Sequence, residues 1–150
     1  MKLAHAVVGA ALCFSSVFAY ADAAKDKAVK MVKDAIEFTK KSGKDATIGL
    51  VNKGDAKFKD GETYITIYDL EGKCIAHASK PARVGGNNLS EKDPTGVAFI
   101  KERIDLVKAK GNGWHSYKFQ NPASKKIENK EAYAELHDGL VYSAGAYFGK

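Results

Sequence analysis

Apolar residues recur at helical spacing near the N-terminal end of the chain. In the range 22–42, Val29, Val32 and Ile36 fall on one side of a helix with 3.6 residues per turn, and alanines widen this stripe. Lysines occupy the last turn and Gly43 follows, a common way for a helix to end. We therefore predict an amphipathic helix over 22–42.

Two further helices are predicted. A short one covers Asp45 to Asn52. Asp93 followed by Pro94 is typical of a helix start, because the aspartate oxygen can cap free backbone N–H groups and proline has no N–H to leave unpaired. This third helix is expected to end at Gly111. Its buried stripe consists of Val97, Ile100, Ile104 and Val107.

The hydrophobic period changes to two near residue 64, which indicates β-strands. Five strands are predicted: Tyr64 to Asp69, Lys73 to Ala78, Trp114 to Phe119, Ile127 to Leu136 and Leu140 to Phe148. A Glu-Gly turn joins the first two strands into a hairpin, and an Asp-Gly turn joins the last two.

This order of elements favours an α+β fold, with a long N-terminal helix and a central five-stranded antiparallel sheet that has helices on its faces. We predict one domain over residues 22–150, with the sheet region in 62–148. Residues 80–89 are rich in Gly and Asn and are expected to form a loop that crosses the sheet. The glycines of this loop lack the spacing of a phosphate-binding motif.

The first 21 residues have the pattern of a signal peptide. Lys2 supplies a positive start, residues 3–18 are mostly apolar, and Ala19-Tyr20-Ala21 fits the small-x-small cleavage pattern. The apolar run is shorter than the roughly 20 residues of a spanning helix. We expect cleavage before Asp22, rather than an uncleaved anchor, and a soluble protein that is periplasmic or secreted.

Cysteine usage excludes an intrachain disulfide after cleavage. Cys13 lies in the leader, without the residues that precede a lipid-modified cysteine, and only Cys74 remains. We expect Cys74 to be a buried, small apolar residue, and a reactive or intermolecular thiol is the alternative.

The formal net charge is +6, from 24 basic and 18 acidic residues. The lysines alternate with acidic residues, and Arg83 and Arg103 are the only arginines, so we expect attraction for small anions and no nucleic-acid partner. His77, His115 and His137 have no second ligand at metal-binding spacing, and catalytic motifs are missing. We therefore predict no metal, no cofactor and no enzymatic activity.

Tyrosines are concentrated on the predicted strands, at positions 64, 68, 117, 133, 142 and 147. Core packing accounts for most tyrosines of this kind, although some could line a cavity and orient a polar ligand. Lys130 is a sharper candidate. In the middle of a strand, a lysine must be exposed, extend its ammonium to the surface, or pair with an anion.

Taken in order, these residues resemble a single Cache domain, the extracytoplasmic sensory module of bacterial chemoreceptors and sensor kinases. The matching motifs cover nearly all of residues 60–148. They are Tyr64-x-Thr66-Ile67-x-Asp69-x-x-Gly72, Ala76-His77-Ala78, Gly86-x-Asn88-Leu89, Asp93-Pro94-x-Gly96, Gly111-x-Gly113-Trp114-x-x-Tyr117, Asn121-Pro122, Lys130-x-x-Tyr133 and Gly145-x-Tyr147.

The resemblance implies a PAS-like fold with a ligand pocket beneath the loop and helix that cross one sheet face. It also implies a small organic acid as ligand, of the acetate, propionate, lactate or pyruvate class. Lys130 would neutralise the carboxylate, and His77 and Tyr133 would donate hydrogen bonds to it. The other predicted site residues are Tyr64, Trp114 and Tyr117 as an aromatic wall, and Thr66, which stands where many relatives carry a large aromatic.

Strand alternation places Trp114 and Tyr117 on opposite faces, and likewise Lys130 and Tyr133. Either a β-bulge redirects one member of each pair, or only one member reaches the pocket.

We therefore expect a free periplasmic binding protein that binds a short-chain carboxylate and signals through a membrane chemoreceptor or a sensor histidine kinase. The first helix is also a candidate surface for a homodimer. The alternative is an exported protein-interaction module that has the Cache fold but no functional pocket.

Overall fold

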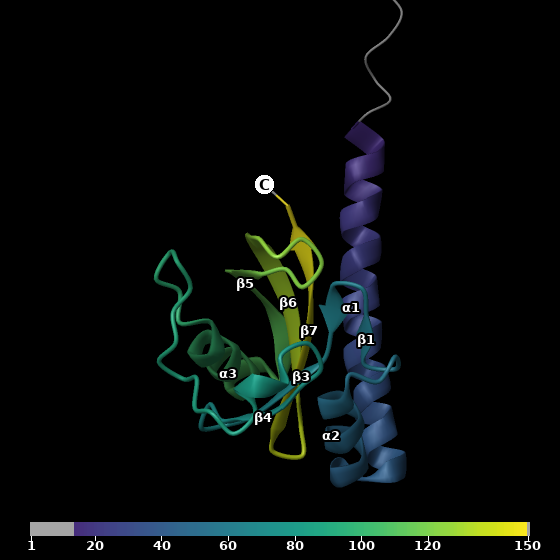
Figure 1. Cartoon of the computed structure of the whole chain (residues 1–150), viewed down its shortest axis with the longest axis vertical. Helices are drawn as coiled ribbons and strands as arrows, with labels where there is room; N and C mark the ends of the chain where they lie inside the picture. The colour runs from purple at the N-terminus through teal and green to yellow at the C-terminus, as the bar shows by residue number, and fades with distance from the viewer. Residues whose placement is uncertain (1–13, 150) are drawn as a thin grey trace, which may run out of the picture.

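The computed structural model of the chain describes residues 14–149 (Figure 1). Its longest element is helix α1 (Phe14–Ser42), and α2 (Lys44–Lys53) follows directly. The helices predicted over 22–42 and 45–52 are thereby confirmed. Gly43 separates them with a φ of 88°, a backbone conformation that glycine adopts without strain.

The predicted signal peptide lies partly outside the described residues, because nothing is described for residues 1–13, Cys13 included. α1 is continuous across the expected cleavage position after Ala21, and cleavage there stays a prediction. Between residues 14 and 149, no helix combines the length and the apolar character that crossing a bilayer requires.

The centre of the fold is an antiparallel sheet with the strand order β4-β3-β7-β6-β5. Its strands are β3 (Thr66–Asp69), β4 (Cys74–His77), β5 (Asn112–Gln120), β6 (Ile127–His137) and β7 (Leu140–Phe148). The α+β fold with a long N-terminal helix and a five-stranded antiparallel sheet is therefore confirmed. β7 is central and is buried at every position from 141 to 147, because both sheet faces are covered.

The first predicted strand is divided in two. Its beginning, β2 (Thr63–Tyr64), pairs with β1 (Lys59–Asp60) in a separate two-stranded sheet, and β3 starts at Thr66. Ile65 lies between the two strands, and its backbone N–H donates to the carbonyl of Phe58. The chain thus leaves one sheet and enters the other at this residue.

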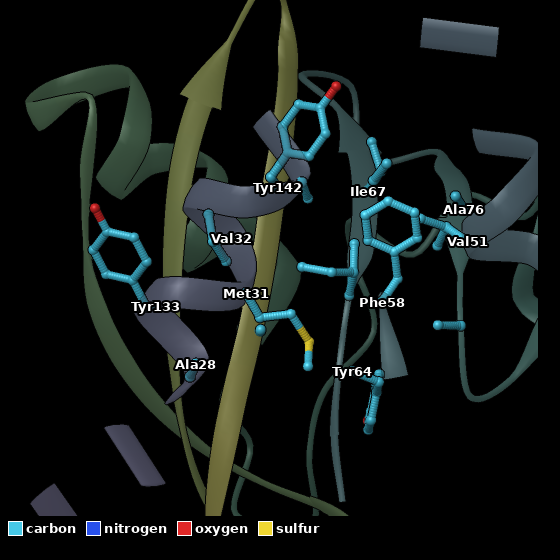
Figure 2. Close-up of a cluster of buried hydrophobic side chains, with 14 of the residues drawn as sticks. Ala28, Met31, Val32, Val51, Phe58, Tyr64, Ile67, Ala76, Tyr133 and Tyr142 are labelled. Atoms are coloured by element: carbon cyan, nitrogen blue, oxygen red, sulfur yellow. The ribbon is translucent and has the colours of Figure 1, made fainter. Parts of the chain in front are cut away.

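α1 covers one face of the sheet, and α2 lies beside it in the same layer (Figure 1). Figure 2 shows the buried cluster on this side, where Met31 and Val32 of α1 lie beside sheet residues Ile67 and Tyr142. Val32 and Ile67 are fully buried. Burial of this apolar stripe is the main contribution of α1 to the stability of the fold.

The opposite face is covered by α3 (Phe99–Lys110) and by the short 3-10 helix η1 (Pro81–Arg83) with its flanking loops (Figure 1). Ile100, Ile104 and Val107 of α3 form a second buried cluster with sheet residues. Cys74 is fully buried in this cluster, which confirms it as a small apolar core residue.

The prediction that a helix starts at Asp93 and Pro94 is wrong, because α3 begins only at Phe99. Gly96 has a φ of 92°, which interrupts any helical run through this segment. The Asp93 carboxylate caps a turn instead, since Oδ1 accepts from the N–H groups of Thr95 and Val97 at 2.8 and 3.0 Å.

The second oxygen of Asp93 reaches the sheet. Oδ2 accepts from the backbone N–H of Lys118 at 2.7 Å, on the free side of the edge strand β5. Asp93 therefore fastens the segment before α3 to the sheet and satisfies an edge N–H that would otherwise lack a strand partner.

Candidate ligand-binding site

A small cavity lies between the sheet and the layer formed by α3 and η1. Its volume is ≈10 Å³, about the space of one water molecule. The lining side chains are Tyr64, Thr66, Tyr68, His77, Arg83, Phe99, Ile100, Arg103, Tyr117, Phe119 and Lys130. This lining includes three basic side chains besides the histidine and no carboxylate.

Five of the seven residues predicted for the site line this cavity. They are Tyr64, Thr66, His77, Tyr117 and Lys130. Strand register brings four of these residues together in two pairs. Tyr117 on β5 is directly opposite Lys130 on β6, and Thr66 on β3 is opposite His77 on β4. Each register pair presents both of its side chains to one face of the sheet.

The other two predicted residues, Trp114 and Tyr133, lie on the opposite face. They are themselves cross-strand partners, three positions from Tyr117 and Lys130, and the register is continuous between the two pairs. An odd offset without a bulge places side chains on the other side of the sheet. Tyr133 packs with the α1 cluster (Figure 2) and its hydroxyl donates to Glu135 at 2.8 Å. Only one member of each pair therefore reaches the cavity.

Lys130 is almost completely buried, with only 3% of its surface exposed. Its Nζ donates to the hydroxyl oxygens of Tyr64 and Tyr147 at 2.9 and 3.3 Å. The same atom lies 4.1 Å from the ring centre of Tyr64 and 4.7 Å from that of Tyr147, close enough for cation–π attraction. These neutral groups are the polar contacts that its ammonium makes among the described residues.

The environment of Lys130 disfavours its charge. Burial lowers the pKa of its ammonium well below the ordinary value, and the nearby cations Arg103 and Lys80 lower it further. Within the described residues no carboxylate forms an ion pair with Lys130. A buried lysine that lacks a counter-ion is rare in proteins, and an anion beside it would relieve this cost.

Arg103 is a second buried cation and was not predicted for the site. It is 2% exposed and lies on the buried stripe of α3, three residues after Ile100 and four before Val107. Its Nη2 donates to the hydroxyl of Tyr117 at 3.0 Å and its Nη1 to the hydroxyl of Thr66 at 3.4 Å. Among residues 14–149 it has no carboxylate partner either. An arginine on an otherwise apolar helix stripe was the sequence signal that could have identified it.

His77 contributes a neutral hydrogen-bond donor. Its Nδ1 accepts from the backbone N–H groups of Ser79 and Lys80 at 3.3 and 2.9 Å. Burial lowers the pKa of the imidazole to about 2, and the charge of Lys130 adds to this effect. The ring is therefore neutral with its proton on Nε2, and it stacks on Tyr64 with 5.2 Å between ring centres.

The outer wall of the cavity is formed by Arg83 and Phe119. Arg83 makes a two-point ion pair with Glu91, and its Nε is buried without a partner among the described residues. Phe119 lies near both Lys130 and the more exposed Lys80, whose Nζ atoms are 5.7 and 4.7 Å from its ring centre. Charge and aromatic surface are thus combined around one small space.

These features define a class of protein: a domain with a PAS-like sheet, a long helix on one face and an enclosed polar cavity under the other. The chain belongs to the family described as Single Cache domain 2, whose family model matches residues 22–140. Cache domains are extracytoplasmic ligand-sensing modules of receptors and kinases.

Solved structures of chemoreceptor sensor domains share this fold. A methyl-accepting chemotaxis protein from Vibrio parahaemolyticus has a TM-score of 0.75 at 26% identity, over 89% of this chain and 94% of that one. A Cache chemosensory domain, described in terms of carboxylic acid recognition, has a TM-score of 0.67 at 20% identity, over 89% and 97% of the two chains.

A curated relative is a sensor histidine kinase, MctS, of Rhizobium johnstonii. It is 40% identical over 87 residues, which are 58% of this chain and 18% of the kinase. The match therefore covers less than a fifth of the length of that relative.

Proposed function

We propose that this protein binds a short-chain carboxylate in the cavity beneath α3. The observation that carries the proposal is the pair of buried cations, Lys130 and Arg103, which share one cavity and have no carboxylate partner in the described part of the chain. Two basic groups without counter-ions in a protein interior are costly, and a bound anion would compensate both.

Each lining group suits part of a small acid. Lys130 and Arg103 supply charge-assisted hydrogen bonds to the carboxylate. The Nε2–H of His77 suits a second oxygen or a 2-hydroxy or 2-oxo group, whereas the Tyr64 hydroxyl is already engaged with Tyr147 and Lys130. Rings such as Tyr117 offer apolar surface to a methyl or ethyl group. Acetate, propionate, lactate and pyruvate are the acids that this set of groups fits, and the carboxylic acid recognition described for a domain of the same fold supports the class.

The size of the cavity sets a condition on binding. A volume of ≈10 Å³ holds about one water molecule, whereas these acids have roughly four to six heavy atoms. Binding must therefore enlarge the cavity. We propose that the outer wall at Arg83 moves, since this residue belongs to the short η1 segment and not to the sheet.

A thermal-shift screen tests the proposal. Acids from C2 to C4 are added to protein that has been unfolded and refolded to remove carried-over ligand. A ligand that binds only the folded state at 100 times its Kd adds about 2.7 kcal/mol to the free energy of unfolding and raises the melting temperature. The absence of a shift with every acid, up to millimolar concentrations, would overturn the proposal.

We further propose that the protein is exported and acts through a separate membrane receptor or kinase, with residues 1–21 as a cleaved signal peptide. N-terminal sequencing of the protein recovered from a periplasmic fraction tests the cleavage, which is expected before Asp22. Light scattering with and without the bound acid tests whether two copies pair through α1.

The second candidate is a protein-interaction module with a closed pocket. The small volume of the cavity favours it, because side chains already fill most of the space beneath α3. It predicts that neither the wild type nor the Lys130→Met variant responds to any acid. A crystal structure grown with a shifting acid, with density between Lys130 and Arg103, would exclude this candidate.

A further inference from the structure

We infer that His115 is a positioning residue of the site, which holds Arg103 by its Nε–H so that a carboxylate can be received only by the two Nη atoms. This inference rests on the proposed function, and it adds a residue and a docking geometry. His115 lies on β5 and is not among the residues that line the cavity.

The contacts of Arg103 carry the first step. Its Nε donates to His115 Nε2 at 3.1 Å, while Nη1 and Nη2 donate to Thr66 and Tyr117. A guanidinium has five N–H groups, so one N–H on each Nη remains free. A carboxylate can dock on arginine side-on, through Nε and one Nη, or end-on, through both Nη atoms. Because His115 occupies Nε, only the end-on arrangement is left.

The ring of His115 is held in one orientation. It stacks on Tyr117 with ring centres 5.1 Å apart and planes within 12° of each other. Tyr117 stacks in turn on Phe99 of α3, at 4.6 Å and 3°. Tyr117 is also the acceptor for Nη2, so one stack of three rings fixes two of the three acceptors of Arg103.

Accepting the hydrogen bond from Arg103 leaves the other ring nitrogen of His115 without a partner within residues 14–149. To accept at Nε2 the ring must be neutral with its proton on Nδ1, and burial, followed by the charge of Arg103, lowers the pKa of the imidazole to about 2. Nδ1 is then a buried donor, and it has no hydrogen-bond partner among the described residues. An unsatisfied buried N–H opposes folding, and fixing the head group of Arg103 is a function that accounts for it.

Nuclear magnetic resonance of the ligand-free protein tests the geometry. The chain has two arginines, so the Nε–H region of a nitrogen-15 spectrum holds two signals, and Arg83→Lys assigns them. We expect slow hydrogen exchange for Arg103 Nε–H. We also expect opposite tautomers, with the proton on Nδ1 in His115 and on Nε2 in His77. A proton on Nε2 of His115 would overturn the inference.

Two variants test the role in binding, with acetate and propionate as probes in calorimetry. His115→Phe keeps a ring to stack on Tyr117 but removes the acceptor, and should weaken binding about tenfold or more, since a hydrogen bond to a charged group is lost. His115→Gln keeps an acceptor oxygen and should remain within about threefold of the wild type. Equal affinities for both variants and the wild type would overturn the positioning role.

The outcomes separate the two proposals. If the wild type binds neither probe while the tautomer and the slow exchange are as expected, the proposed function fails, and the positioning role falls with it. If the wild type binds but His115→Phe binds equally well, only the role of His115 fails. Melting temperatures of both variants show whether a loss of affinity reflects unfolding.

Discussion

Lys130 Nζ lies 2.9 Å from the hydroxyl oxygen of Tyr64 and 4.1 Å from the centre of the same ring. One side chain therefore gives the ammonium both a hydrogen-bond acceptor and a π face, in a cavity where no carboxylate is present. Such contacts replace only part of the hydration that a buried charge loses. The buried ammonium therefore lowers the stability of the ligand-free protein, as expected if the site serves the proposed binding of an anion.

Replacing Lys130 by Met should separate these two properties. Exchanging a buried basic group that lacks a counter-ion for an apolar side chain of similar length often stabilises a protein, so we expect the ligand-free melting temperature to rise by about 5 °C. The shift caused by acids should disappear. Lys126→Met, at an exposed lysine, is the matched control and should change neither. A ligand-free Lys130→Met protein that melts well below the wild type would contradict this reading.

Binding of an acid should be accompanied by proton uptake. Burial lowers the pKa of Lys130 in the free protein, and a carboxylate beside it raises that pKa again. The complex then binds more protons than the free protein, so affinity should fall as pH rises above the lowered pKa of the free protein. Calorimetry above pH of about 6, where the acid is already ionised, should give different heats in buffers of different ionisation enthalpy.

His77 is the other titratable group that could take up this proton, because its pKa is lowered by burial and by Lys130. His77→Asn keeps an acceptor for the backbone N–H groups and removes the imidazole. Uptake that persists in this variant belongs to Lys130. Equal heats in all buffers would mean that Lys130 keeps one protonation state throughout.

Much of the fold could be predicted because the patterns are local. The stripe of Val29, Val32 and Ile36 located α1, and the period-two pattern located the strands of the sheet. The start of α3 could not be predicted, because Asp93 has the chemistry of a helix cap. In the structure its acceptor oxygens instead bind a turn and the backbone N–H of Lys118. Which backbone groups compete for one carboxylate is decided by tertiary structure.

The candidate site could likewise be predicted only in part. Alternation indicated that Trp114 and Tyr117 lie on opposite faces, but the sequence did not say which face α3 covers. Arg103 was overlooked because its charge suggested an exposed position, although its spacing from Ile100 and Val107 matched the buried stripe. A charged residue at a core-spaced position was the stronger signal.

Gly145→Ala should disturb the site at the side chain of Lys130. A Cβ at this position would lie 2.6 Å from Cε of Lys130 and 2.7 Å from the carbonyl oxygen of Glu131, closer than atoms pack. Since the carbonyl belongs to the paired strand β6, the backbone must shift, and overpacking of this kind costs about 1–3 kcal/mol. We expect a lower melting temperature and weaker acid binding.

Gly49→Ala is the matched control for this substitution. Gly49 lies within α2, and a Cβ there meets no atom within 4 Å. Alanine is the better helix former, so this variant should be more stable than the wild type by about 0.5–1 kcal/mol, with unchanged acid affinity. A Gly145→Ala protein that behaves like Gly49→Ala would show that β6 and β7 are farther apart than described.

Asp93 should make the fold sensitive to strong acid. Burial raises the pKa of its carboxyl, but hydrogen bonds from the backbone N–H of Lys118 and the hydroxyl and N–H of Thr95 outweigh it and lower the pKa to about 2. A carboxyl with a lowered pKa in the folded state contributes stability above its unfolded value near 4, and this is lost as pH falls toward 2. Asp93→Ala should cost about 2 kcal/mol at pH 7. Denaturant unfolding should show this difference shrinking between pH 4 and 2, and a constant difference would contradict the assignment.

Trp114 and Tyr117 offer the most direct comparison of the two sheet faces. Tyr117→Phe keeps the ring stacked between His115 and Phe99 but removes the hydroxyl that accepts from Arg103 at 3.0 Å. With one acceptor fewer, Arg103 is held less firmly, and we expect acetate and propionate to bind about fivefold to tenfold more weakly.

Trp114→Phe should leave acid affinity within about twofold of the wild type, because the indole is 37% exposed on the face that packs against α1. Calorimetry on both variants, with melting temperatures as the control for folding, measures the contrast. A Trp114→Phe protein that loses binding while Tyr117→Phe keeps it would mean that the ligand sits on the α1 side of the sheet. The buried cations would then need another explanation, since Lys130 and Arg103 both face away from that side.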